Sequence, residues 1–150
     1  MSIFSSINTS ASGLTAQRLR MDVVSSNIAN SETTRARVDE NGEWEPYRRK
    51  LVTFQSEGNS FRSHLEAQRN QRSETSDVRA SVITEDRAPF RMVYNPEHPD
   101  ADEMGYVRMP NVDPLKEMVD LMSATRSYEA NVTALNASKG MLMKALEIGK

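Results

Sequence analysis

The chain has 150 residues, the size of about one domain, and its composition is polar: 37% of the residues are apolar, 27% are charged and the mean hydropathy is −0.63. The net charge of −2 gives no general electrostatic case for binding nucleic acid or an anionic membrane, and no apolar run is long enough to span a bilayer. Cysteine is absent, which excludes disulfides, thiolate chemistry and cysteine-based metal sites. The small apolar share predicts a core that is thin or shared with partners.

Residues 1–30 predict a long helix with a narrow apolar stripe. Apolar side chains recur every seven residues, with Ala11 and Val24 between them at spacings of three or four. A stripe this narrow is typical of the seam between two helices and not of a helix that covers a globular core. The stripe consists of Ile7, Leu14, Met21 and Ile28.

Residues 31–111 predict a small β-containing insert. Partial alternation through Trp44, Leu51 and Phe54 indicates a strand that follows a turn at "ENGE", residues 40–43. Two short strands are expected over 80–84 and 90–94, and a third near 105–111, after a break at prolines 96 and 99. The polar stretch 58–79 has no persistent period and is expected to be a flexible loop.

A basic cluster lies at the start of this insert. One interpretation is a solvated strand balanced by nearby glutamates, and the other is a patch that faces a partner. Nucleic acid fits poorly, because no stacking aromatics interleave with a sustained basic run. The cluster consists of Arg35, Arg37, Arg48, Arg49 and Lys50.

Residues 112–150 predict a second long helix. Asp113 is suited to the N-cap, Pro114 to the first helical position and Glu117 to the first turn. Apolar residues again repeat every seven positions, and others interleave at three and four, with Lys139 as one flaw. The seam is expected to consist of Met118, Leu121, Thr125, Tyr128, Val132, Leu135, Leu142 and Leu146.

The expected fold is therefore mainly α, with the two terminal helices paired as a coiled coil and the small β-rich insert between them. Two alternatives stay open for the isolated chain. In one, the helices are largely frayed in the monomer and become complete on assembly, because few apolar side chains oppose the entropy of ordering long helices. In the other, they form a stable monomeric hairpin.

No catalytic, metal or cofactor site is expected. The tripeptide "HPD", residues 98–100, follows Asn95 and Pro96 and indicates a plain turn. The two histidines lie in unlike contexts, and no acid–base pair, phosphate loop or nucleophile elbow is present. The N-terminal stretch lacks the basic and apolar regions of a Sec-type signal, so a dedicated route is expected if the protein leaves the cytoplasm.

The stretch "RMDVVSSNIANSETT", residues 20–34, resembles the N-terminal signature of the flagellar axial proteins, the rod and hook family. "RSYEANVTALNASK", residues 126–139, resembles the matching C-terminal signature, and "PYRRKLVTF" and "YNPEHPDADEMGYVRMPNVDP" look like its proximal-rod branch. The family-motif residues are Ser26, Asn27, Asn30, Tyr128 and Asn131.

This resemblance implies a structural subunit and not an enzyme. The subunit would be exported unfolded by the flagellar type III apparatus and would assemble helically, with copies of itself and other rod proteins, into the drive shaft of the basal body. Its terminal helices would form an inner coiled-coil layer. The competing hypothesis is a cytoplasmic adaptor or regulatory protein that binds partners through a helical hairpin.

Asn27 and Asn30 are expected where the first helix leaves its seam. An asparagine amide hydrogen-bonds nearby backbone groups and so suits helix ends. Ile28 would pack inward while the flanking amides satisfy end carbonyls or reach a neighbouring helix. Replacing Asn27 or Asn30 with leucine is expected to leave synthesis intact and to impair assembly.

Overall fold

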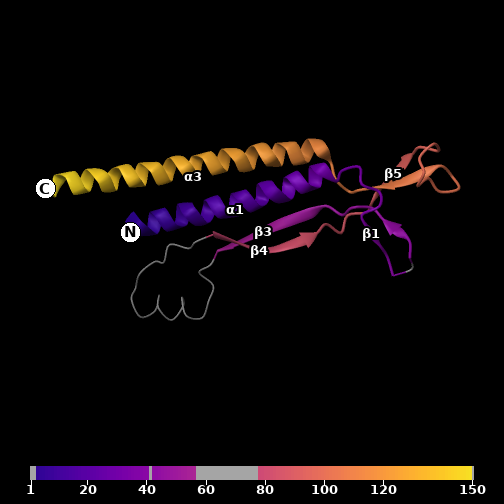
Figure 1. Ribbon diagram of the computed structural model, residues 1–150, viewed down its shortest axis with the longest axis horizontal. Coiled ribbons are helices and arrows are strands. Elements are labelled where there is room, and N and C mark those ends of the chain that lie inside the picture. Colours follow the sequence, from indigo (N-terminus) through magenta and orange to yellow (C-terminus); the bar gives the residue numbers. More distant parts are fainter. Residues whose placement is uncertain (1–2, 41, 57–77, 150) are drawn as a thin grey trace. The chain divides into compact units, whose positions relative to one another are not determined.

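The computed structural model describes residues 3–40, 42–56 and 78–149 and is mainly helical (Figure 1). Helix α1 spans Ile3–Ala29 and helix α3 spans Pro114–Ile148. Between them, the described residues contain six strands, which form three two-stranded sheets, β1 with β2, β3 with β4 and β5 with β6. The strands are β1 Arg37–Val38, β2 Trp44–Glu45, β3 Lys50–Ser56, β4 Val78–Glu85, β5 Arg91–Tyr94 and β6 Tyr106–Met109.

The helix ends follow local chemistry. Asp113 caps α3, since its carboxylate accepts a hydrogen bond from the Leu115 N–H at 3.0 Å, and Pro114 is the first helical residue, as the sequence predicted. At the end of α1, the Asn30 amide donates to the Ser26 carbonyl at 2.8 Å, which satisfies one of the carbonyls left open by the last turn. The expected role of Asn30 at the helix end is therefore confirmed.

The insert has the predicted turns and most of the predicted strands. Gly42, with φ of 82°, lies in the turn between β1 and β2, and Gly105, with φ of 79°, lies before β6. Strands β4, β5 and β6 correspond to the three expected strands, although β4 already begins at Val78. The remainder of the predicted loop 58–79 lies outside the described residues. The Asp100 N–H donates to His98 Nδ1 at 3.1 Å, which confirms the turn at 98–100.

The chain divides into two compact units, and each helix contributes to both. Unit 1 takes in 1–21, 52–82 and 122–150, and unit 2 takes in 22–51 and 83–121. Within unit 1, Ser6 Oγ lies 3.4 Å from Ser138 Oγ, and a Cβ added to Gly13 would lie 3.2 Å from Asn131 Nδ2. From the first contact to the second, the residue number rises by seven on α1 and falls by seven on α3. The two helices are therefore antiparallel neighbours in unit 1.

The side chains buried along α3 in the single chain are small or polar, and they form a line beside the predicted seam. This line of buried or half-buried side chains repeats every seven residues, one position before the interleaved residues of the predicted seam. It consists of Glu117, Ala124, Asn131 and Ser138. Met118 and Leu146 are instead 51% and 69% exposed, and Thr125 is also exposed. Ser138 is buried in this line, and the neighbouring Lys139 is exposed. The other predicted positions are half-buried: Ile7, Leu14, Met21, Ile28, Leu121, Tyr128, Val132, Leu135 and Leu142.

Candidate functional site, the polar junction at Asn27

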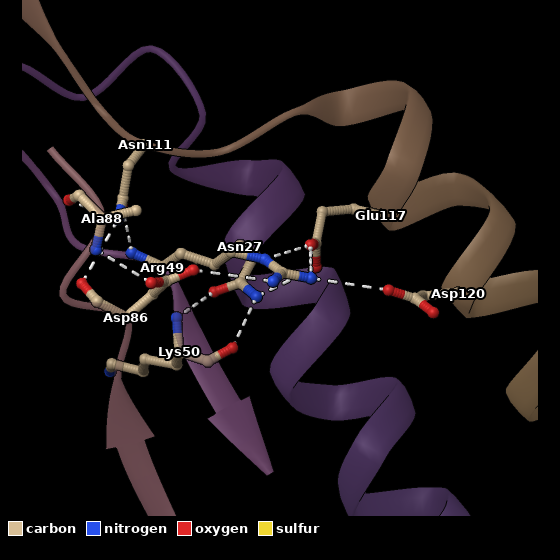
Figure 2. A network of polar contacts seen from close by, with 8 residues as sticks. All are labelled: Asn27, Arg49, Lys50, Asp86, Ala88, Asn111, Glu117 and Asp120. Atoms are coloured by element: carbon tan, nitrogen blue, oxygen red, sulfur yellow. Dashed lines mark hydrogen bonds and ion pairs between the residues drawn. The ribbon is translucent and has the colours of Figure 1, made fainter. Parts of the chain in front are cut away.

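A network of polar contacts in unit 2 joins the last turn of α1, the start of β3, the first turns of α3 and the segment before it (Figure 2). We call this network the polar junction. Its central side chains are those of Asn27, Arg49, Asn111 and Glu117.

Asn27 has every hydrogen-bonding position of its amide filled. It is only 1% exposed. Its Nδ2 donates to the Lys50 carbonyl and to Glu117 Oε2, both at 2.9 Å. Its Oδ1 accepts from the Lys50 N–H at 2.9 Å and from the Tyr47 hydroxyl at 3.0 Å. An asparagine amide offers two donors and two acceptor positions, so this side chain pairs with the strand backbone as another peptide group would.

Glu117 is fully buried and is compensated by Arg49. Arg49 Nε donates to Glu117 Oε1 at 2.6 Å, and the same guanidinium lies 3.4 Å from Asp120 and 3.7 Å from Asp86. A buried carboxylate is strongly destabilising when it has no partner, and a buried pair requires good geometry and further hydrogen bonds to recover its desolvation energy. Here the second Glu117 oxygen receives the Asn27 amide, so both oxygens are satisfied.

Asn111 fixes the backbone of Arg49 from the other side. Its Oδ1 accepts from the Arg49 N–H at 2.8 Å, and its Nδ2 donates to the carbonyls of Asp86 and Ala88, both at 3.2 Å. The Asp86 N–H in turn donates to the Arg49 carbonyl at 2.8 Å. Arg49 is thus held by its main chain as well as by its guanidinium, and it is positioned to neutralise Glu117.

The four arginines of the predicted basic cluster pair with acidic residues inside unit 2. Arg37 and Arg48 both bind Glu45, which agrees with the interpretation of a strand balanced by nearby glutamates. Arg35 donates to Asp100, and this hydrogen bond, together with one from Thr34, lowers the pKa of the Asp100 carboxyl. Hydrogen bonds from Arg37 and Arg48 likewise lower the pKa of Glu45. Arg48 also lies 4.4 Å from the centre of the Phe90 ring. These pairs hold the β segments of the unit together.

The chemistry of the junction is structural. Its side chains are engaged with one another, and the described part of the chain contains no group of three or more histidine, cysteine or acidic residues that would hold a metal ion. Neither described helix combines the length and apolar character needed to cross a membrane. The arrangement fixes how α1, β3 and α3 meet.

Two family descriptions match the two ends of the chain. "Flagella basal body rod protein" matches residues 7–37, and "Flagellar basal body rod FlgEFG protein C-terminal" matches residues 103–148. Whole-chain relatives carry the name flagellar basal-body rod protein FlgC. One from Bacillus subtilis is 64% identical over 100% of both chains, and one from Borreliella burgdorferi is 43% identical over 99% of this chain and 98% of its own.

The chain belongs to the FlgC family of flagellar basal-body rod proteins. As an FlgC-family member it is a structural subunit of the rod and is located in the basal body of the bacterial flagellum. Its relatives are structural rod proteins. Family membership decides against the alternative of a cytoplasmic adaptor.

The motif residues predicted from the FlgC-like pattern fall into two groups. Ser26, whose hydroxyl lies 3.4 Å from the Tyr47 hydroxyl, and Asn27 belong to the junction, and Asn30 follows at the helix end. Tyr128 and Asn131 lie on α3 in unit 1, where Asn131 donates to the Ser127 carbonyl at 2.9 Å and faces Gly13.

The sequence did not reveal Arg49 as the partner of Glu117. The two residues are 68 positions apart, and each fits a simpler local interpretation, one as a surface cation and one as a first-turn acid. One available signal was the seven-residue series that begins at Glu117, which contains only small or polar residues and avoids the Lys139 flaw.

Proposed function

We propose that this FlgC-family subunit is built helically into the proximal part of the rod, together with other rod proteins and copies of itself, and transmits torque there. In the assembled rod α1 and α3 pair as a coiled coil in the inner layer, and the β segments lie farther out. The assembly interface includes the predicted seam and the large apolar side chains of α3 that are exposed in the single chain.

The observation that carries this proposal is the distribution of apolar side chains on α3. Along this helix the buried apolar residue is Ala124, whereas large apolar side chains face outward at both ends. Apolar residues that recur at i, i+3, i+4 and i+7 on an exposed helix face mark a contact surface. The exposed ones are Leu115, Met118, Val119, Met122, Met141, Met143, Leu146 and Ile148.

The contacts between the helices support a heptad seam. Ser6 with Ser138 and Gly13 with Asn131 are related by seven-residue steps on both helices, and the Asn27 contact with Glu117 comes fourteen residues farther along each helix. A regular seven-residue repeat favours coiled-coil packing. Small side chains at these positions allow a close approach.

Export in an unfolded state and ordering on assembly fit the same composition. Unit 1 has little buried apolar surface among its described residues, so its helices have a small hydrophobic contribution of their own. Helix formation coupled to docking supplies that contribution at the growing end and keeps free subunits from polymerising early.

A charge placed on the exposed face of α3 tests the proposal. Met118→Glu is expected to abolish rods and swimming in cells that depend on this chain, because a carboxylate would be buried in the assembly contact. Ala134→Glu, an exposed position of the same helix outside the stretch Leu115–Met122, is the matched control and is expected to support swimming. Normal rods with Met118→Glu would contradict the proposed interface, provided that secretion of both variants is equal.

A further inference from the structure

Strand β4 has large apolar side chains exposed on both of its faces. It pairs with β3 in a two-stranded sheet, and all of its residues except Ala80 are exposed. Val82 and Ile83 are 52% and 48% exposed, and as consecutive strand residues they point to opposite faces. A sheet of two strands is marginally stable in water unless further strands or a helix complete it. On its β4 side, therefore, this sheet is incomplete in the single chain.

The hydrogen bonds between the two strands show which backbone groups of β4 point outward. The N–H of Asp86, directly after β4, donates to the Arg49 carbonyl, directly before β3, at 2.8 Å. Backbone groups of successive strand residues point to opposite edges, so those of Val82 also face β3, whereas those of Ser81 and Ile83 point away from it. Within the described part of the chain, these outward N–H and C=O groups have no hydrogen-bonding partner.

The outer edge of β3 is occupied where that strand begins. The N–H and the C=O of Lys50 both bind the side-chain amide of Asn27 at 2.9 Å (Figure 2). The same alternation places the backbone groups of Lys50 on the edge away from β4, which agrees with the assignment of the outward groups of β4. Asn27 thus takes the position of a neighbouring strand beside Lys50, and no such side chain pairs with the described edge of β4 at Ser81 and Ile83.

The sequence of β4 lacks the residues that normally prevent an edge strand from pairing. Proteins protect such edges with prolines, lysines or bulges. Residues 80–84, "ASVIT", contain no proline, glycine or charged residue, and three of the five are β-branched. Strand β5, in contrast, lies between Pro89 and Pro96 and begins with Arg91. An unprotected edge of this composition is a template for another strand.

We propose that β4 accepts an extended strand of a neighbouring rod subunit, whose backbone pairs with the outward N–H and C=O groups of Ser81 and Ile83. In this mode of recognition the main-chain hydrogen bonds give affinity, and the added strand covers apolar side chains such as Val82. The added strand is a segment other than β4, because two copies of β4 would pair symmetrically and close into a dimer, whereas contacts between unlike segments propagate into open helical assemblies. The inference rests on the proposed rod assembly and specifies one of its contacts.

Amide hydrogen exchange of the unmodified chain, free in dilute buffer and in purified basal bodies, tests this pairing. The N–H groups of Ser81 and Ile83 are expected to exchange about tenfold or more slowly in basal bodies, and the slowing is expected to be smaller for Val82, which faces β3 in both states.

Unchanged exchange at Ser81 and Ile83 in basal bodies that contain the chain would overturn the inference and leave the proposed function intact. Equal slowing at all three amides would indicate general burial instead of strand pairing and would also overturn it. Absence of the chain from purified basal bodies would overturn the inference and the proposed function together.

A proline at Ser81 tests the same contact in cells. Ser81→Pro removes an outward N–H and none that faces β3, and edge strands tolerate proline at such positions. It is expected to reduce the number of rods about tenfold or more. Glu103→Pro is the control and is expected to support swimming, because Glu103 is exposed and is the second residue of a turn in which Gly105 N–H donates to the Asp102 carbonyl at 2.9 Å, a position that favours proline.

A circular dichroism spectrum of the purified Ser81→Pro chain that matches the unmodified chain excludes misfolding as the cause of lost rods, and the exchange measurement decides if the spectra differ. A normal number of rods with Ser81→Pro would overturn the inference. A stable dimer of the purified, unmodified chain in which Ser81 and Ile83 are both protected would also overturn it, because β4 would then pair with itself.

Discussion

The two units of the chain are stabilised in different ways. Unit 2 buries Val23, Val24, Tyr47, Val107 and Val112 and surrounds a polar junction in which Asn27 and Glu117 are fully paired. The apolar residues that unit 1 buries, within its described part, are Ala16 and Ala124. Unit 2 thus has the means to hold its own arrangement, and unit 1 has little.

This difference indicates that the two parts of each helix, one in unit 1 and one in unit 2, have different roles. Buried, satisfied polar groups are strongly disrupted when one partner is removed, so they favour a single arrangement of the segments that they join. Exposed apolar surface favours association with other chains. In this protein the junction fixes the last turns of α1 against the first turns of α3, and the long helical parts in unit 1 are left to be completed by neighbours.

The largest expected effect comes from removing the cation of the junction. Arg49→Met leaves the buried Glu117 carboxylate without a compensating charge, and the free energy of unfolding of unit 2 is expected to fall by about 3–5 kcal/mol. Urea unfolding of the isolated chain, followed by tyrosine and tryptophan fluorescence, measures this loss. Arg91→Met, at an exposed position of β5, is the matched control and is expected to change stability by less than about 0.5 kcal/mol. Equal losses of unfolding free energy in the two variants would show that the junction stabilises unit 2 no more than an exposed arginine does.

A substitution of one atom tests the amide of Asn27. Asn27→Asp cannot donate to the Lys50 carbonyl or to Glu117, and each buried group left unsatisfied costs about 1–3 kcal/mol. The same unfolding measurement is expected to show a loss of about 2 kcal/mol or more. Asn30→Asp removes only the bond to the Ser26 carbonyl and is expected to cost about 1 kcal/mol or less. A larger effect at Asn30 than at Asn27 would contradict the account.

Two glycines in the helices of unit 1 test whether the helices must approach each other closely. Gly140 has open space around it, so Gly140→Ala is expected to stabilise the helix by about 0.5–1 kcal/mol and to leave swimming normal. Gly13→Ala gains the same helix propensity, but its new methyl group would lie 3.2 Å from an Asn131 amide that is bonded to Ser127. Swimming haloes are expected to shrink with Gly13→Ala and not with Gly140→Ala. Identical haloes would show that the helices need no close approach at this point.

The smallest expected effect concerns pH. The hydrogen bond from Arg35 lowers the pKa of Asp100 from its usual value of 3.8, so the folded state holds this proton less tightly than the unfolded state does. The contribution of the pair to stability is therefore present above pH 3.8 and is lost as the pH falls through the lower folded pKa. Carboxyl NMR titration of the folded chain is expected to give an Asp100 midpoint below 3.8, which rises in Arg35→Gln. A midpoint unchanged by Arg35→Gln would rule out this pairing in solution.

Local sequence signals predicted the elements of the fold well. The Asp113–Pro114 start of α3, the glycine turn before Trp44 and the strand at 106–109 each depend on a few neighbouring residues, and the structure has all three. The long-range features were harder to predict. Arg49 and Glu117 are 68 residues apart, and no local pattern distinguishes a buried pair from two surface charges.

Within the single chain, the line buried along α3 lies one residue before the interleaved positions of the predicted seam, and apolar character does not identify it. Met118 is apolar and exposed, whereas its neighbour Glu117 is charged and fully buried. A chain that associates with neighbours places apolar residues outside, so hydrophobic periodicity alone does not identify its inner face. The helices follow from sequence, but the register of their contact does not.

Hydrogen exchange of the isolated chain in dilute buffer tests the central claim most directly, because it reports the two units separately along the same two helices. The account predicts slow amide exchange in residues 22–29 and 115–121, which flank the polar junction, and fast exchange in residues 3–21 and 122–148. Equal and strong protection along the whole of both helices would contradict it, because the helices of unit 1 would then be stable without neighbours.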